Sequence, residues 1–179
     1  MKILVCVSVV PDTTTKITFT DGNTQFNKTG VQFIINPYDE LALTRALDIT
    51  EPIGGTVTVI TVGEADTEPV IRKALAMGAT DAIRVDANPS DGMYVAAQIA
   101  EQAKSGEYDM ILTGRESIDY NGGQVQGLIA EMLNWPLINV AMELDVTDKK
   151  VTAVRDIDGG RETISVNTPV VVSAQKDLC

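Results

Sequence analysis

The sequence contains no histidine and only two cysteines, and these shortages exclude several kinds of chemistry. Without an imidazole there is no Ser-His-Asp or Cys-His catalytic group, and the commonest metal ligand in proteins is missing. Cys6 lies in an apolar run and Cys179 is terminal, so the pair does not indicate a disulfide framework. No nucleophile–base pair and no metal-ligand spacing is visible. We therefore predict no catalytic residue, no metal site and a reducing, cytoplasmic setting.

Positive charge and long apolar runs are also scarce. Fourteen lysines and arginines face 25 acidic residues, which gives a net charge of −11 and argues against nucleic acid or an anionic membrane as a partner. No apolar run approaches the roughly 20 residues of a membrane helix, so we predict no membrane insertion. The first ten residues lack a signal-peptide cleavage site. An anionic ligand would have to be held by local donors rather than by a basic field.

The residues that are present predict an α/β fold. Apolar, β-branched runs at residues 2–10, 56–62, 82–85, 110–113 and 137–140 are typical of strands buried on both faces. Amphipathic segments separate them, and one begins at Asn36-Pro37, a cap followed by a first-turn proline. This alternation predicts a Rossmann-like, doubly wound parallel sheet with right-handed crossovers.

Two segments depart from the α/β alternation. Residues 16–26 predict a hairpin around Asp21-Gly22. From residue 141 to 167 the pattern changes to period two, which predicts an antiparallel β meander, and residues 169–173 form a last apolar strand. No repeat or linker interrupts the chain, so we expect a single domain over residues 1–179 with a β extension.

The segment 113–129, TGRESIDYNGGQVQGLI, has the order strand, glycine-containing loop, helix. The start of a helix offers unpaired N–H donors and a partial positive charge, which suits a phosphate. An ordinary turn with a glycine pair explains the spacing equally well, and the segment is neither a P-loop nor a G-x-G-x-x-G turn. Ligands of such sheets bind beyond the carboxyl ends of the strands. Residues 6–10, 61–63 and 113–119 are therefore predicted to form one site.

The same loop with its flanks, LTGRESIDYNGGQVQGLIAEMLNWP, resembles the electron transfer flavoprotein β subunit. The resemblance continues through LVCVSVVPD, INPYDE, ALAMGATD and DGG.E, which follow in the family's order and together span nearly the whole chain. It implies an adenine nucleotide α-hydrolase-like fold with AMP or FAD as the cofactor. It also implies an electron carrier rather than an enzyme, with an α subunit and flavin dehydrogenases such as acyl-CoA dehydrogenase as partners.

The resemblance also implies a set of cofactor-binding residues. Several of them have a simpler explanation: Cys6 as a core residue, Asn36 as a helix cap, Gly63 as a turn and Arg115 as a surface cation. The residues are Cys6, Asn36, Asp39, Val62, Gly63, Arg115, Asp119, Gly123, Gln124 and Val125.

Three departures from the family pattern bear on this prediction. Gly123-Gln124-Val125 replaces the Asn-Gln-Thr of AMP-binding members, and with Arg115 it resembles the flavin-bifurcating branch, so AMP and FAD both stay open. Ser8-Val9 replaces the usual lysine and polar residue. The chain ends before the family's dehydrogenase-docking loop and C-terminal arm, so we expect a fragment or an armless subunit. The alternative function is a stand-alone nucleotide sensor of the universal-stress type, although its terminal Gly-Ser/Thr pattern is missing.

Overall fold

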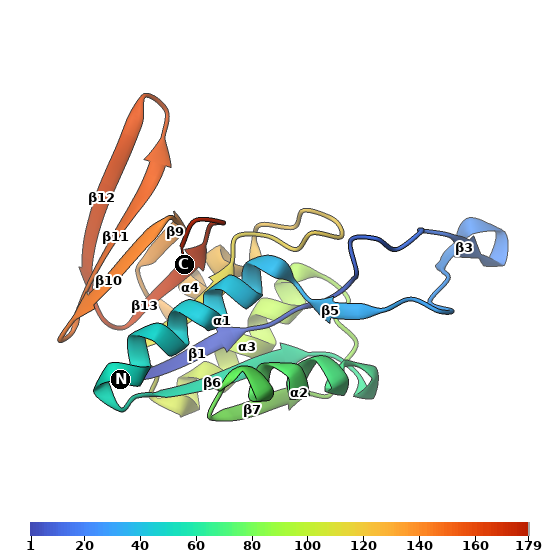
Figure 1. Cartoon of the computed structure of the whole chain (residues 1–179), viewed down its shortest axis with the longest axis horizontal. Coiled ribbons are helices and arrows are strands. Elements are labelled where there is room, and N and C mark those ends of the chain that lie inside the picture. The colour runs from blue at the N-terminus through green and yellow to red at the C-terminus, as the bar shows by residue number, and fades with distance from the viewer. Residues whose placement is uncertain (179) are drawn as a thin grey trace.

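The apolar runs form one parallel sheet in the computed structural model, which describes residues 1–178 (Figure 1). The strand order is β7-β6-β1-β8-β13-β9, and every neighbouring pair is parallel. The two strands β8 and β13 are buried along their whole length, as continuous apolar runs predict. The predicted fold class is confirmed. The strands are β1 (Lys2–Cys6), β6 (Thr56–Val62), β7 (Asp81–Val85), β8 (Met110–Gly114), β9 (Leu137–Ala141) and β13 (Val170–Ala174).

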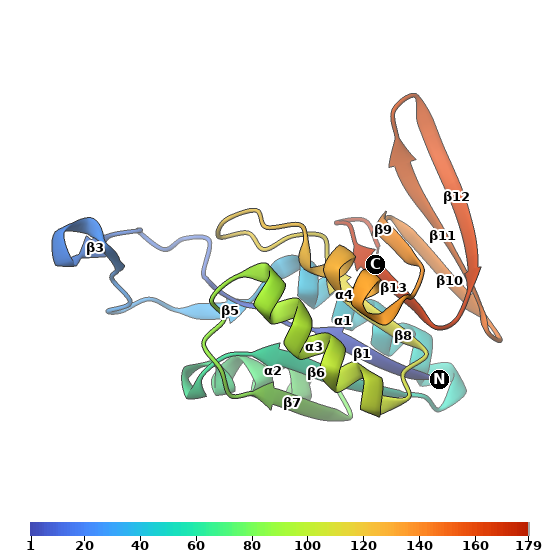
Figure 2. The ribbon, with the colours of Figure 1, turned by 180° about the vertical axis from the view of Figure 1, so that it is seen from behind.

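Helices cover both faces of this sheet and enclose two hydrophobic clusters (Figures 1 and 2). The helices α1 (Pro37–Thr50) and α2 (Glu68–Met77) pack on one face, and α3 (Gly92–Gly106) and α4 (Val125–Leu133) pack on the other. Short 3-10 turns lie at Glu51–Ile53 and Ala65–Thr67. Within residues 1–178, none of the helices combines the length and apolar character needed to cross a membrane.

The first strand is shorter than predicted, because the chain leaves the sheet after Cys6. The next strand, β2 (Val9–Pro11), pairs antiparallel with β5 (Phe33–Ile35) instead of extending β1. Between β2 and β5 the chain forms an arm that reaches away from the body (Figure 1). The predicted hairpin lies there as β3 (Phe19–Thr20) and β4 (Gln25–Phe26), joined by a 3-10 turn at Asp21–Asn23 whose residues all have positive φ. Its strands are shorter than expected.

The predicted meander is confirmed as a three-stranded antiparallel sheet that projects at the end opposite the arm (Figures 1 and 2). Leu144, Val151 and Ala153 join the cluster beneath α1, and the Arg45 guanidinium of α1 donates to the Leu144 carbonyl. The meander is therefore attached to the body through one face. Its strands are β10 (Glu143–Thr147), β11 (Lys150–Ile157) and β12 (Gly160–Asn167).

This attachment predicts different costs for two truncations in the same small sheet. Leu144 is 2% exposed and Ile157 is 48% exposed. Leu144→Ala should lower the free energy of unfolding by about 2–5 kcal/mol, because it leaves a cavity in the core. Ile157→Ala, the matched control, should change it by less than about 0.5 kcal/mol. Denaturant unfolding measures both, and equal losses at the two sites would contradict the packing described.

Candidate functional site

A cleft of about 680 Å³ opens at the carboxyl ends of β1, β6 and β8. The three strand ends predicted to form one site do lie together, since residues from 6–9, 60–63 and 113–114 all line the cleft. The starts of α3 and α4 and the loop between β8 and α4 complete its wall. We call residues 115–124 the cleft loop.

The carboxylate of Asp39, in the first turn of α1, joins two of these strand ends. Its Oδ2 accepts hydrogen bonds from the backbone N–H of Ser8 at 2.8 Å and from the Ser8 hydroxyl at 2.5 Å. Its Oδ1 accepts from the N–H of Gly114 at 2.8 Å. Burial raises the pKa of Asp39 from the ordinary 3.8 to about 6, although the hydrogen bonds from Ser8 and Gly114 oppose the rise. Asp39 therefore braces the cleft floor.

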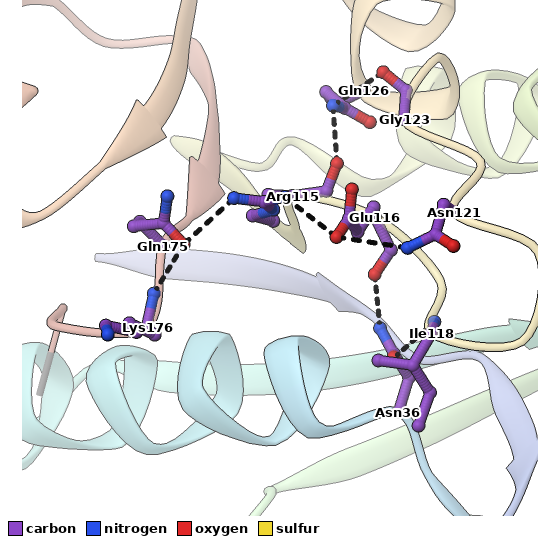
Figure 3. Close-up of polar contacts among 9 residues, drawn as sticks. All are labelled: Asn36, Arg115, Glu116, Ile118, Asn121, Gly123, Gln126, Gln175 and Lys176. Carbon is purple, nitrogen blue, oxygen red and sulfur yellow. Dashed lines mark hydrogen bonds and ion pairs between the residues drawn. The ribbon is translucent and has the colours of Figure 1, made fainter. Parts of the chain in front are cut away.

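Asn36 holds the cleft loop rather than capping its own helix. It occupies the N-cap position of α1 but makes no side-chain cap hydrogen bond, so the capping explanation is wrong for its side chain. Its Nδ2 donates to the Glu116 carbonyl at 2.9 Å, and its Oδ1 accepts from the N–H of Ile118 at 3.2 Å (Figure 3). The side chain is fully buried. The start of α1 thus sets the path of a loop 80 residues further along the chain.

Eight of the ten predicted cofactor-binding residues line the cleft, and Arg115 and Gly123 do not. The Arg115 guanidinium instead lies 2.8 Å from Glu116 Oε1 and 3.4 Å from Gln175 Oε1 (Figure 3), with its centre 5.2 Å from the centroid of the Tyr38 ring. Gly123 directs its carbonyl to the Gln126 amide. The lining residues of the predicted set are Cys6, Asn36, Asp39, Val62, Gly63, Asp119, Gln124 and Val125.

Gly63 and Cys6 are limited in what they can offer a ligand. The N–H of Gly63 donates to the Val85 carbonyl, and its own carbonyl accepts from Arg84. A Cβ at Gly63 would lie 2.5 Å from Thr67 Cγ2, so the glycine makes room for that side chain. Burial, followed by the nearby Asp39 charge, raises the pKa of the Cys6 thiol far above its usual range, so the thiol stays protonated and unreactive.

The rim of the cleft is acidic apart from one lysine that sequence reasoning missed. Lys28, carried by the arm, lines the cleft and lies 3.4 Å from Asp66. No local signal marked it, because its position depends on how the arm returns to the body. The acidic lining residues outside the buried Asp39 are Glu64, Asp66, Asp91, Glu116 and Asp119.

The two helix starts in the cleft differ in what they offer a ligand. The Asp91 carboxylate accepts from the N–H of Tyr94 at 2.8 Å and so already provides an anion at the start of α3. At the start of α4, Gln124 makes no side-chain cap hydrogen bond. The first N–H groups of a helix have no partners within the helix, and they favour an anion. The start of α4 is therefore where the cleft can hold a phosphate despite its acidic rim.

An open parallel sheet covered by helices on both faces, with a cleft at its carboxyl edge, defines the class of doubly wound α/β proteins, which bind their ligands at that edge. Residues 23–179 match the family model described as the electron transfer flavoprotein domain. The chain therefore belongs to the electron transfer flavoprotein family, and relatives that are 32–35% identical to it are named as β subunits. These relatives do not favour the alternative of a stand-alone universal-stress-type sensor.

Three relatives illustrate this similarity, and each aligns with 99% of the chain. The electron transfer flavoprotein subunit beta of Bacillus subtilis is 35% identical, and the chain covers 70% of its length. The human protein of the same name is 32% identical with 72% of its length covered. The acryloyl-CoA reductase electron transfer subunit gamma of Anaerotignum propionicum is 33% identical with 68% covered.

The buried carboxylate makes a prediction about pH. Because the folded-state pKa of Asp39 lies above the ordinary value, the folded protein binds the extra proton between about pH 4 and 6. Stability from this group is thus present at low pH and is lost as pH rises through that window. The free energy of unfolding of the wild type minus that of Asp39→Asn should fall by about 2 kcal/mol from pH 4 to 7.

Denaturant unfolding at several pH values measures this difference. Asp48→Asn, at an exposed position of the same helix, controls for the change of charge itself. A difference that stays constant or rises with pH would show that Asp39 carries no burial cost.

Proposed function

We propose that the cleft binds an adenine nucleotide, AMP or FAD, and that the chain works as the β subunit of a heterodimeric electron carrier. One observation carries the proposal: eight residues marked by the family resemblance, from four separate stretches of sequence, line one cleft at the carboxyl edge of the sheet. Sharing a cleft of this size and position is what a single nucleotide site requires.

The lining residues would divide the nucleotide between them. The N–H groups at the start of α4 would bind phosphate, with Gln124 offering both donors and an acceptor and Lys28 adding one positive charge. The strand end at Val62 would lie against the adenine. Val125 supplies no hydroxyl to the phosphate, so the backbone has the larger share of the work. The residues of this chain would position the bound nucleotide.

The two nucleotides differ in how their phosphate charge is spread. The diphosphate of FAD spreads its charge over more loop N–H groups than the terminal phosphate of AMP, which favours FAD at a site without the hydroxyl. The acidic rim opposes the phosphate charge of both nucleotides. The Arg115 guanidinium, engaged by Glu116 and Gln175, lends FAD no contact in the conformation described.

The partners follow from the family. An α subunit would supply the flavin that exchanges electrons, and flavin dehydrogenases, such as an acyl-CoA dehydrogenase, would be the donors. The chain itself would act as a carrier subunit and not as an enzyme. The buried, protonated Cys6 suits a reducing compartment, and we place the complex in the cytoplasm.

The heterodimer tests the assignment directly. Co-expression with the α subunit should yield a 1:1 complex, and mass spectrometry of the ligand released on denaturation should identify AMP or FAD. One FAD with one AMP per heterodimer assigns AMP to this cleft, whereas two FAD assign FAD. A complex that releases no adenine nucleotide beyond the flavin of the α subunit would refute nucleotide binding here.

Lys28 makes a second test possible within the cleft. Lys28→Met should weaken AMP binding by about two- to fivefold at low ionic strength, since an exposed ion pair contributes about 0.2–1 kcal/mol. The effect should shrink as salt is added, and adenosine, which has no phosphate, should bind equally well to both proteins. Lys104→Met on the outer surface of α3 is the matched control. Calorimetry showing equal losses for AMP and adenosine would remove Lys28 from the phosphate site.

A further inference from the structure

The cleft loop has little main-chain structure of its own. Two backbone hydrogen bonds lie within it, from Asn121 to the Ser117 carbonyl at 2.8 Å and from Ser117 to the Gly122 carbonyl at 3.2 Å. Yet Glu116, Ser117 and Asp119 from this loop line the cleft. Its shape must therefore come from side chains that reach it from neighbouring elements.

One of these side chains joins the two ends of the loop. Gln126, the second residue of α4, is 4% exposed. Its Nε2 lies 3.0 Å from the Arg115 carbonyl and 2.9 Å from the Gly123 carbonyl (Figure 3). Both partners can only accept, so the amide nitrogen must face them. A single amide group thus hydrogen-bonds to both ends of residues 115–123 and holds these ends together.

The Gln126 amide is itself anchored in the sheet. Its Nε2 also lies 3.3 Å from Asn139 Oδ1, which accepts from the Ser173 hydroxyl at 2.6 Å. The N–H of Val140 donates to that hydroxyl at 2.7 Å, so the Ser173 hydroxyl accepts one hydrogen bond and donates another. Ser173 is fully buried in β13.

The backbone beside this anchor is unusual. Val140 has a φ of 63°, a left-handed conformation that is rare for a β-branched residue. The pairing of β13 with β9 shifts register at the same place. Strain of this kind persists only where the surroundings over-determine it, and the Ser173 hydroxyl is the group that holds the Val140 N–H. The ends of β9 and β13 are therefore shaped to present Asn139 to Gln126.

We propose that Gln126 is a positioning residue for the nucleotide: its amide keeps the cleft loop closed, so that the loop's N–H groups face the ligand. This inference rests on the proposed function, because it concerns the same cleft. Gln126 also lines the cleft, but its Nε2 is directed to the two loop carbonyls, and the proposed role requires hydrogens on that nitrogen. Sequence reasoning passed over it, because the motif drew attention to Gly123-Gln124-Val125.

Gln126→Glu tests the need for a donor with almost no change of shape. An ionised carboxylate there would face the oxygens of Arg115, Gly123 and Asn139 and repel them, whereas a protonated one can donate. The affinity of the full chain for AMP and FAD, expressed as a ratio to the wild type at each pH, should be lowered about tenfold or more at pH 8. It should recover as pH is lowered toward 5. Using the ratio cancels the titration of Asp39 and of the ligand phosphate.

Two further variants separate a donor from a packing role. Gln126→Leu has similar bulk and no donor, so its affinity should be lowered without recovery at low pH. Gln102→Glu, on the exposed face of α3, should match the wild type throughout. A loss in Gln126→Glu that does not depend on pH, or affinities equal to the wild type in both Gln126 variants, would overturn the proposal.

Hydrogen exchange on the ligand-free chain keeps this test distinct from the test of nucleotide binding. In Gln126→Leu, and in Gln126→Glu at pH 8, the amides of Ser117 and Asn121 should lose protection while those of β1 and β8 keep theirs. If the wild type binds neither AMP nor FAD, nucleotide binding fails while the exchange data still report on the closed loop. Unchanged protection at Ser117 and Asn121, or a loss that spreads through the sheet, overturns the role of Gln126.

Discussion

The site depends on one buried carboxylate. Asp39 takes donors from Ser8 and from Gly114, and in doing so it pins the ends of β1 and β8 to the first turn of α1. A charge in this position is unfavourable unless it is hydrogen-bonded, and the elevated pKa records that the bonds compensate the burial only in part. The close approach also explains a glycine, since a Cβ at Gly114 would lie 2.4 Å from Asp39 Oδ1. The cleft floor is thus built around a group that itself need not react.

From this floor the loop is held by amide side chains. Asn36 reaches the loop from the start of α1, and Gln126 reaches it from the start of α4. Both are buried and both satisfy backbone groups that the irregular loop leaves without main-chain partners, as buried polar groups require. Side chains from two helices thus set the path of the loop, in a cleft whose charged lining residues are six acidic side chains and one lysine.

The two projections of the molecule suit a subunit rather than an isolated binding protein. The arm carries exposed Ile17 and Phe19, and the meander projects at the opposite end of the body (Figure 2). A two-stranded ribbon with so little packing is marginal by itself, and an antiparallel sheet with a free face leaves edges that a partner can cover. These features agree with membership of a family whose relatives are named as subunits. The body, by comparison, encloses two complete clusters around its own sheet.

The sequence by itself determined the sheet, its helices and the meander, because continuous apolar runs, amphipathic spacing and period-two alternation are local signals of burial. It also determined which strand ends meet, since the carboxyl ends of parallel strands share one edge. Only the tertiary structure decided the end of β1 at Cys6, the placement of Lys28, the outward engagement of Arg115 and the bonds of Asn36 and Gln126. The physical reason is that side-chain partners are chosen by the folded chain: Asn36 contacts a loop 80 residues away, and even the nearer partners of Gln126 follow from the path of the loop rather than from a sequence pattern.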